Sequence, residues 1–369
     1  MLNGLLFRSG VYVLQISNCT MKLDQITIKD IAKALNLSIA TVSRALRDSY
    51  KISQVTKQKV LDYATAHNYR PNLMAQSLKN KKSRTIGVII SSVPNNFFAE
   101  VINGIESVAS QKDYHVIITQ SQESREKEIK NTEHLAWKSV DGLLVSLSTE
   151  TEDVNHFKKL HEFGLPFVFF DRITNDIKTH LVVVDNCGGA KKATQHFIEG
   201  GYKRIAHITS SANTSITKER LEGYYQALQL NNIPIEENYI KYCQHGGMNK
   251  EEIENAIDEL FALDNPPDAL LAASDRLTIG SFSILKKRNI SIPDTIALAG
   301  FCNFSSPELF YPSLTTIRQP ALEMGKAAAE LLIELIEAKR PVSTFKKIEL
   351  PIELQVRNSS LSRREHGIC

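Results

Sequence analysis

Residues 27–46 read TIKDIAKALNLSIATVSRAL, and this stretch predicts two short helices joined by a turn. Thr27 is a good N-cap for the first helix, because its hydroxyl can accept a hydrogen bond from a free backbone N–H group. Apolar residues then recur at helical spacing on one face: Ile28, Ile31, Ala32 and Leu35. Residues 36–38 interrupt this pattern, and Ser38 can cap the second helix. The expected inward residues of that helix are Val42, Ala45 and Leu46.

A third helix is predicted to start after Ser53, with a core of Val55, Val60, Leu61 and Ala64. Two short helices across a three-residue turn form a helix-turn-helix, which offers its second helix to the major groove of DNA. Amphipathic three-helix units without DNA contacts are the alternative, and the basic charge favours the DNA-binding interpretation. Residues 22–84 contain thirteen Lys and Arg against four Asp and no Glu, whereas residues 85–369 contain thirty basic and thirty-seven acidic side chains. A basic block ahead of an acidic body is typical of a polyanion-binding module.

The quoted stretch resembles the DNA-binding motif of the lactose-repressor (LacI) family of bacterial transcription regulators. The resemblance continues through residues 68–89, NYRPNLMAQSLKNKKSRTIGVI, and spans nearly all of residues 26–358. It implies that the first, second and sixth residues of the recognition helix contact bases, here Ile39, Ala40 and Arg44. An arginine can form a bidentate contact with guanine, and apolar side chains suit a thymine methyl group. Phosphate contacts are expected from Thr41, Ser43, Ser53 and Thr56, and Thr27 also belongs to the expected DNA-binding set.

Residues 71–79, PNLMAQSLK, resemble the hinge of the same family. The family hinge forms a short helix only when two protomers meet on DNA, and its leucine inserts into the minor groove at the centre of the operator. That leucine is Leu78 here, and Asn72 and Lys79 complete the expected DNA-binding set. The flanking match favours insertion, which would kink the DNA, over a leucine that is merely exposed in a linker.

Composition limits the class of protein. The chain has 369 residues, of which 42% are hydrophobic and 23% are charged, as in a soluble globular protein of two or three domains. The five cysteines are scattered and form no CxxC pair, so a disulfide framework and a zinc site are not expected, and a reducing cytoplasm fits best. No apolar run approaches the ~18 residues of a membrane span.

Residues 1–20 lack the continuous apolar core of a secretion signal, which predicts a dispensable leader with Met21 as a plausible start.

After residue 84, short β-rich runs alternate with helical segments, which predicts parallel sheets covered by helices. The runs are TIGVIISS, HVIITQS, DGLLVSLS, PFVFFD, LVVVD, RIAHITSS, ALLAAS and IALAGF. The resemblance implies an α/β body of two doubly wound lobes, like a periplasmic binding protein, with crossovers near residues 185–187, 313–315 and 342–345. The expected organisation is a leader 1–20, a three-helix DNA-binding domain 21–70, a hinge 71–83, an effector-binding and dimerisation domain 84–360, and a tail 361–369. Lobe 1 is expected at about 84–186 and 314–343, and lobe 2 at about 187–313 and 344–360.

Ligands of open α/β sheets bind beyond the carboxyl ends of the strands, and between two lobes those ends face one cleft. The resemblance places the small-molecule effector there and carries over a set of residues from the family. Arg220 matches an arginine that binds effector hydroxyls or a carboxylate, and Phe97 and Phe98 match aromatic positions. The other expected effector residues are Ser148, Asp171, Ser274, Asp275 and Cys302. A helix cap or a packing role is the alternative for each of them.

One position departs from the family pattern. The family has an aspartate in a GFDN or GYDD motif, whereas this sequence reads GFCN, with Cys302 in that place. A neutral thiol is a poor acceptor, so the departure argues against any specific sugar or nucleobase and leaves room for an anionic effector. The resemblance still implies a small-molecule effector, which is expected to be carbohydrate-like. Residues 360–369 lack the leucine heptads of a tetramerising coiled coil, which favours a homodimer.

Two other classes of protein fit the sequence less well. A solute-binding receptor would use the same two-lobed body, but it would carry a secretion signal and no helix-turn-helix. An enzyme would need a catalytic motif, and GxSxG, HExxH and a phosphate-binding loop are all absent from the sequence. The histidines show no metal-ligand spacing, so no cofactor or metal is expected. The sequence therefore predicts a ligand-responsive DNA-binding regulator, most simply a repressor, that acts in the cytoplasm without a membrane partner.

Overall fold

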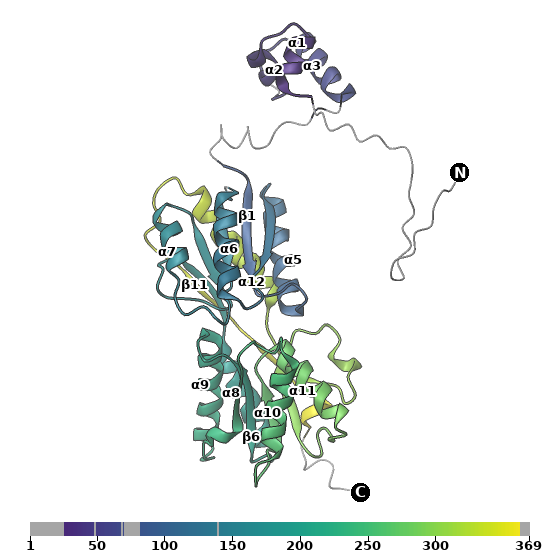
Figure 1. Cartoon of the computed structure of the whole chain (residues 1–369), viewed down its shortest axis with the longest axis vertical. Coiled ribbons are helices and arrows are strands. Elements are labelled where there is room, and N and C mark those ends of the chain that lie inside the picture. Colours follow the sequence, from purple (N-terminus) through teal and green to yellow (C-terminus); the bar gives the residue numbers. More distant parts are fainter. Residues whose placement is uncertain (1–25, 48, 68, 70–81, 139, 362–369) are drawn as a thin grey trace, which may run out of the picture. The chain divides into compact units, whose positions relative to one another are not determined.

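The computed structural model of the chain describes residues 26–361, except residues 48, 68, 70–81 and 139. It divides into two compact units, residues 1–81 and 82–369 (Figure 1). The expected leader, the hinge residues Asn72, Leu78 and Lys79, and residues 362–369 of the tail lie outside the described residues.

The first unit contains the three predicted helices, α1 (Ile28–Ala34), α2 (Ile39–Ala45) and α3 (Gln54–Ala66). The three predicted N-caps are confirmed. Thr27 and Asp30 form a reciprocal capping box, in which the Thr27 backbone N donates to Asp30 Oδ2 at 2.8 Å. The hydroxyl of Ser38 accepts from the Thr41 backbone N at 3.1 Å, and that of Ser53 accepts from the Thr56 backbone N at 3.3 Å.

The core of this unit is smaller than the sequence predicted. Its buried apolar residues are Ile31, Ala32, Val42, Ala45, Val60 and Ala64. The prediction that Val55 and Leu61 belong to the core is wrong, since they are 69% and 37% exposed. Val60 and Ala64 are one helical turn apart on one face of α3, whereas Leu61 is rotated about 100° from Val60 and Val55 lies off that face. Tyr63 and Leu46 pack against the edge of the core instead.

The second unit consists of two lobes, each built on a six-stranded sheet. The sheet of lobe 1 is parallel and has the order β11-β5-β4-β3-β1-β2. Its strands are β1 (Thr85–Ile90), β2 (His115–Gln120), β3 (Gly142–Val145), β4 (Phe167–Phe170), β5 (His180–Val184) and β11 (Lys347–Leu350). Its helices are α5 (Asn96–Gln111), α6 (Arg125–Trp137), α7 (Asn155–Glu162) and α12 (Ala321–Glu337). In Figure 1 the yellow-green α12 lies among the blue and teal elements of this lobe.

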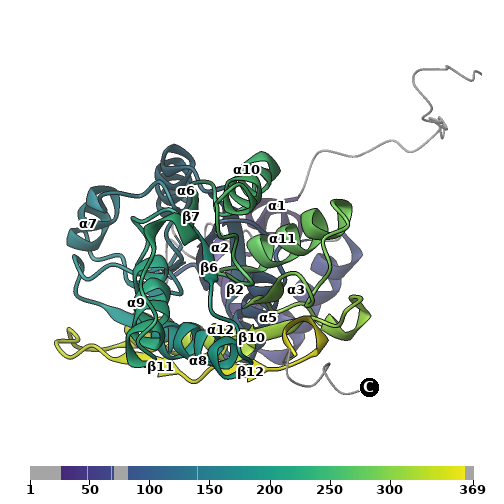
Figure 2. The same cartoon turned by 90° about the horizontal axis from the view of Figure 1, so that it is seen from below.

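The sheet of lobe 2 has the order β12-β10-β9-β8-β6-β7, with β12 antiparallel to β10 and the other pairs parallel. Its strands are β6 (Ile205–Ser210), β7 (Ile240–Cys243), β8 (Ala269–Ala272), β9 (Ala297–Phe301), β10 (Thr315–Arg318) and β12 (Glu353–Gln355). Its helices are α8 (Asn186–Glu199), α9 (Ser215–Leu230), α10 (Lys250–Phe261) and α11 (Asp275–Lys287), with 3₁₀ turns at Glu237–Tyr239, Pro307–Leu309 and Asn358–Ser360. Figure 2 shows α8 and α9 on one side of β6, and α10 and α11 on the other.

The chain crosses between the lobes three times, and two crossovers lie further along than predicted. The first crossover falls at Asp185–Asn186, as the sequence indicated. However, β10 belongs to lobe 2 and β11 to lobe 1, so the later crossovers are at residues 319–320 and 351–352 instead of 313–315 and 342–345. In each sheet the strand order reverses next to the first strand, between β1 and β3 and between β6 and β8, which is where ligands bind in this topology.

Glycine allows two helix pairs of the body to approach closely. A Cβ at Gly325 of α12 would lie 2.1 Å from the Val101 carbonyl oxygen of α5. A Cβ at Gly223 of α9 would lie 2.0 Å from the Cys187 carbonyl oxygen of α8. These pairs cover one face of each sheet. None of the described helices is long and apolar enough to cross a membrane.

Candidate functional site

The second helix of the first unit exposes the side chains that the sequence assigned to DNA. Ile39, Ala40 and Arg44 are exposed on α2, and Thr41 and Ser43 are partly exposed. The hydroxyls of Thr41 and Thr56 lie against the capping serines, with Oγ–Oγ1 distances of 2.8 Å to Ser38 and 2.9 Å to Ser53. Buried Val42 and Ala45 fix α2 to the other helices, so its outward face is held rigidly for contact with a partner.

In the body, one predicted site residue is almost completely buried. Arg220 of α9 is 2% exposed. Its guanidinium donates to Asn186 Oδ1 at 2.9 Å, to Gln319 Oε1 at 2.9 Å and to the carbonyl oxygen of Ala273. It also lies 3.7 Å above the ring of Phe301. Arg220 therefore contacts two of the three crossovers and the end of β8.

Arg220 makes no ion pair within 4 Å among the described residues. Burial lowers its pKa to about 10, although Asp171 and other nearby carboxylates oppose the shift. A guanidinium at that pKa is still charged at neutral pH. The body thus holds a buried cation whose partners are neutral oxygens, which is a suitable anchor for a polar ligand.

Asp171 and Asp275 approach Arg220 from the two lobes. Asp171 follows β4 in lobe 1 with a left-handed φ of 58°, and its Oδ2 accepts from Ser146 Oγ at 3.2 Å. Burial raises its pKa against the charges of Arg172 and Arg220. Asp275 begins α11 in lobe 2, and its Oδ1 accepts from the Asn303 backbone N at 2.7 Å. Burial raises the pKa of Asp275 to about 6.

Cys302 lies beside Asp275. It is 1% exposed, and its side chain is hydrogen-bonded to the Asp275 carboxyl. Burial, with the Asp275 charge as the next cause, raises the pKa of the thiol. The thiol therefore stays protonated and donates to Asp275, whereas an aspartate here would add a second carboxyl. Asp171, Arg220, Asp275 and Cys302 form the part of the predicted site that the structure brings together.

The other predicted effector residues have local structural roles in this conformation. Ser274 caps α11 by accepting from the Leu277 backbone N at 3.3 Å. The Ser148 hydroxyl pairs with Thr151 Oγ1 at 2.8 Å. Phe97 and Phe98 begin α5 and pack edge to face at 5.2 Å, with 4% and 3% of their surfaces exposed. These four residues lie near strand or helix ends, as predicted. Their hydroxyls are hydrogen-bonded and their rings are packed within the protein, which fits the alternative of a cap or a packing role.

A charged pair in lobe 1 escaped the sequence analysis. Glu123 follows β2 and Arg172 follows β4, and Arg172 Nη1 donates to Glu123 Oε2 at 2.6 Å with both side chains buried. Burial would raise the pKa of Glu123, but the charge and hydrogen bond of Arg172 hold it below its ordinary value. The strand-end rule that selected Asp171 applies equally to Arg172, so the sequence contained the signal for it.

Asn303 directly follows Cys302 and connects the two lobes. The sequence analysis did not identify it. Its Nδ2 donates to Glu100 Oε2 of α5 at 2.9 Å and to the Gln319 carbonyl oxygen at 2.8 Å. Glu100 further pairs with Arg318 at 3.3 Å. A pocket of about 690 Å³ is lined by Glu100, Arg318 and Gln319 and by Pro320 and Pro351 of the crossovers. The strand ends and the crossovers thus form one connected polar region.

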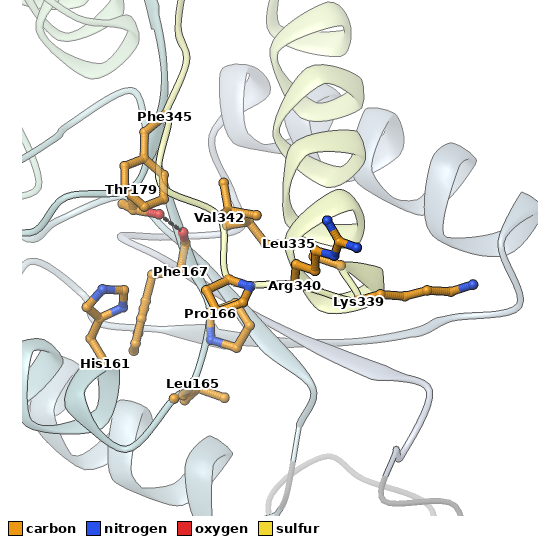
Figure 3. Close-up of a pocket in the computed structure, with 13 residues that line it drawn as sticks. His161, Leu165, Pro166, Phe167, Thr179, Leu335, Lys339, Arg340, Val342 and Phe345 are labelled. Carbon is orange, nitrogen blue, oxygen red and sulfur yellow. Dashed lines mark hydrogen bonds between the residues drawn. The ribbon is translucent and has the colours of Figure 1, made fainter.

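A second pocket, of about 510 Å³, lies elsewhere in lobe 1 (Figure 3). It is lined by residues around Phe167, which begins β4, and by the end of α12. Figure 3 shows Val342 and Pro166 beside Phe167, while Lys339 extends away from them. The amino end of β4 is the opposite edge of the sheet from Asp171, so this pocket is not part of the predicted effector site.

Comparison with known proteins decides the family. Residues 27–72 match "Bacterial regulatory proteins, lacI family", and residues 83–356 match "Periplasmic binding proteins and sugar binding domain of LacI family". The chain belongs to the LacI family. It is 31% identical to the HTH-type transcriptional repressor PurR of Vibrio campbellii over 90% of this chain and 98% of the relative. It is also 31% identical to the ribose operon repressor of Halalkalibacterium halodurans over 90% and 97%. The transcriptional regulator CelR in complex with cellobiose has a TM-score of 0.67 at 26% identity, over 91% and 100% of the chains.

Membership of the LacI family confirms the predicted class and fold. The chain is a DNA-binding transcription regulator with a helix-turn-helix domain and a two-lobed ligand-binding body. Its relatives are transcription regulators, so the prediction that it is not an enzyme is confirmed. The roles assigned to individual DNA-binding and effector-binding residues remain predictions.

Proposed function

We propose that the chain is a cytoplasmic repressor that binds a pseudo-palindromic operator as a homodimer and responds to a carbohydrate-like effector held between its lobes. In each half-site Ile39, Ala40 and Arg44 contact bases in the major groove, and neighbouring hydroxyls contact phosphates. The hinge, residues 71–83, places Leu78 at the operator centre. The domain boundaries follow the sequence prediction, apart from the two displaced crossovers.

The arrangement around Arg220 supports the effector site best. Its guanidinium joins Asn186 of the first crossover, Gln319 of the second crossover and the end of β8 in lobe 2. A ligand that displaces or adds one of these contacts changes how the crossovers are held, and therefore the relation between the lobes. Such a coupling between two sites is typically ~1–3 kcal/mol.

The chemistry of the site favours a hydroxylated metabolite. Asp171 and Asp275 supply acceptors, and Arg220, whose guanidinium is held over the Phe301 ring, supplies donors. Cys302 stands where the family has an aspartate, so the site carries one carboxylate fewer. We infer that this chain tolerates a carboxylate on the effector better than relatives that keep the aspartate.

The proposal is tested with the full chain and with DNA selected from a randomised library. D-ribose, cellobiose, D-glucose, D-glucuronate and hypoxanthine are added separately, and the unfolding midpoint and the operator affinity are measured. An effector at 100 times its Kd stabilises the folded chain by about 2.7 kcal/mol. The same compound is expected to change operator affinity, and Arg220→Lys is expected to weaken that change while keeping effector-free operator binding. An unchanged response in Arg220→Lys would remove Arg220 from the site.

A further inference from the structure

Three buried polar atoms of lobe 1 have no hydrogen-bond partner among the described residues and belong to neighbouring side chains. They are Glu123 Oε1, Thr149 Oγ1 and Arg172 Nε, on residues that are 2%, 2% and 8% exposed. The Glu123 carboxylate joins the three residues, because its Oε2 accepts from the Thr149 backbone N at 3.0 Å and from Arg172 Nη1 at 2.6 Å. An unpaired buried polar atom costs about 1–3 kcal/mol, so three in one place need an explanation.

The position of these atoms points to the region between the lobes. They follow β2, β3 and β4, at the carboxyl edge of the lobe 1 sheet. Lobe 2 covers them through Gly246, where a Cβ would lie 3.5 Å from Glu123 Oε1 and 3.9 Å from Thr149 Cγ2. Arg276 of α11 also acts electrostatically on Glu123. A group bound here contacts both lobes.

The hydrogen-bonding capacities of the three atoms select the ligand chemistry. A carboxylate oxygen only accepts, an arginine Nε only donates, and a threonine hydroxyl does both. An anionic ligand group would suit Arg172 but would face Glu123, and a cationic group would suit Glu123 but would face Arg172. A pair of alcohol groups matches both, because each hydroxyl can donate and accept.

We propose that Glu123, Thr149 and Arg172 form a subsite that binds two neighbouring hydroxyl groups of the effector. This inference rests on the proposed function and extends it, since these residues are distinct from the Arg220 set. One hydroxyl donates to Glu123 Oε1, the other accepts from Arg172 Nε, and Thr149 Oγ1 completes the network. Because Gly246 closes the subsite from lobe 2, filling it favours the arrangement in which the lobes meet.

Thr149→Val is the most informative substitution, because the Thr149 hydroxyl has no hydrogen-bond partner among the described residues. Replacing an unpaired buried hydroxyl by a methyl group of similar shape is expected to leave the unfolding midpoint unchanged or to raise it. Affinity for a hydroxylated effector is expected to fall roughly threefold to tenfold, the value of one hydrogen bond. Thr149→Ser keeps the hydroxyl and is expected to retain most of the affinity.

Ser281→Ala is a matched control. The Ser281 hydroxyl is also buried without a partner among the described residues, but it lies within α11 and not at the carboxyl edge of lobe 1. This variant is expected to bind the effector with wild-type affinity. A similar loss in Ser281→Ala and Thr149→Val would show a general effect of core change and would overturn the subsite.

The full chain and its variants are titrated by calorimetry with D-ribose, cellobiose, D-glucose and D-glucuronate. The best of these is then compared with its monodeoxy analogues. If the subsite is correct, one deoxy analogue binds the wild type more weakly but binds Thr149→Val with no further loss. Wild-type affinity in Thr149→Val would show that water alone occupies the space, which overturns the inference and leaves the Arg220 site intact. A response to hypoxanthine and to none of the sugars would overturn both this inference and the carbohydrate-like effector of the proposed function, while the operator-binding part of that function would stand.

Discussion

Asp275→Asn should change how the stability of the body depends on pH. The Asp275 carboxyl is 6% exposed, accepts from the Asn303 backbone N at 2.7 Å and has a pKa raised to about 6, mainly by burial. Asparagine keeps the shape and can still accept from Asn303 through its own oxygen, but it does not titrate. The difference between the two proteins therefore isolates the cost of ionising this carboxyl.

The sign and size of the effect follow from the two pKa values. The pKa of Asp275 rises from 3.8 in the unfolded chain to about 6 in the folded chain. Between these values the folded state holds a proton that the unfolded state has released, so stability falls as pH rises. A shift of about two pKa units corresponds to about 3 kcal/mol in total, of which about 2 kcal/mol is lost between pH 4.5 and 7.5.

Urea unfolding at pH 4.5, 6 and 7.5 measures this difference. The unfolding free energy of Asp275→Asn minus that of the wild type is expected to rise by about 2 kcal/mol across the range. All other titrating groups are common to both proteins and cancel. A difference that stays constant, or falls with pH, would refute the reasoning, because it would mean that the folded body does not penalise the ionised carboxyl.

Three further predictions concern packing and DNA. Gly325→Ala is expected to reduce the unfolding free energy by about 1–3 kcal/mol, because its Cβ would collide with the Val101 carbonyl oxygen, and calorimetry checks this. Arg44→Ala is expected to cost ~1–3 kcal/mol per half-site and to relax the preference at one base pair, whereas equal weakening on all sequences would make Arg44 a phosphate contact. Leu78→Ala is expected to reduce DNA bending and the preference at the central step, with the half-site preference unchanged in binding selection.

Local chemistry made the first unit predictable. Thr27, Ser38 and Ser53 could be identified as caps because a cap depends on residues three positions apart. The outward face of α2 followed from helical spacing. Val55 and Leu61 were misassigned because apolar character alone does not say which face of α3 the other helices cover.

The body was predictable at its strand ends and less so where distant segments meet. Asp171 and Asp275 follow apolar strands, and parallel topology brings such ends to one edge. The partners of Arg220 are Asn186, Ala273 and Gln319, up to 99 residues away, and no local pattern links them. The sequence did contain a signal for the two displaced crossovers, because each has a proline just after a strand. Pro351 directly follows β11, and Pro320 lies two residues after the end of β10.

Burial disfavours the charged forms of the groups between the lobes, and this suits a ligand sensor. Burial raises the pKa of Asp171 and Asp275 and lowers the pKa of Arg220 and Arg276, so each charged form is destabilised by folding. A ligand that supplies hydrogen bonds to these groups removes part of that cost, and so it binds the folded lobes in preference to other states. A response at the operator further requires that the effector make these contacts better in one arrangement of the lobes than in another. Asp171 lies in lobe 1 and Asp275 in lobe 2, so a ligand that contacts both carboxyls meets this requirement.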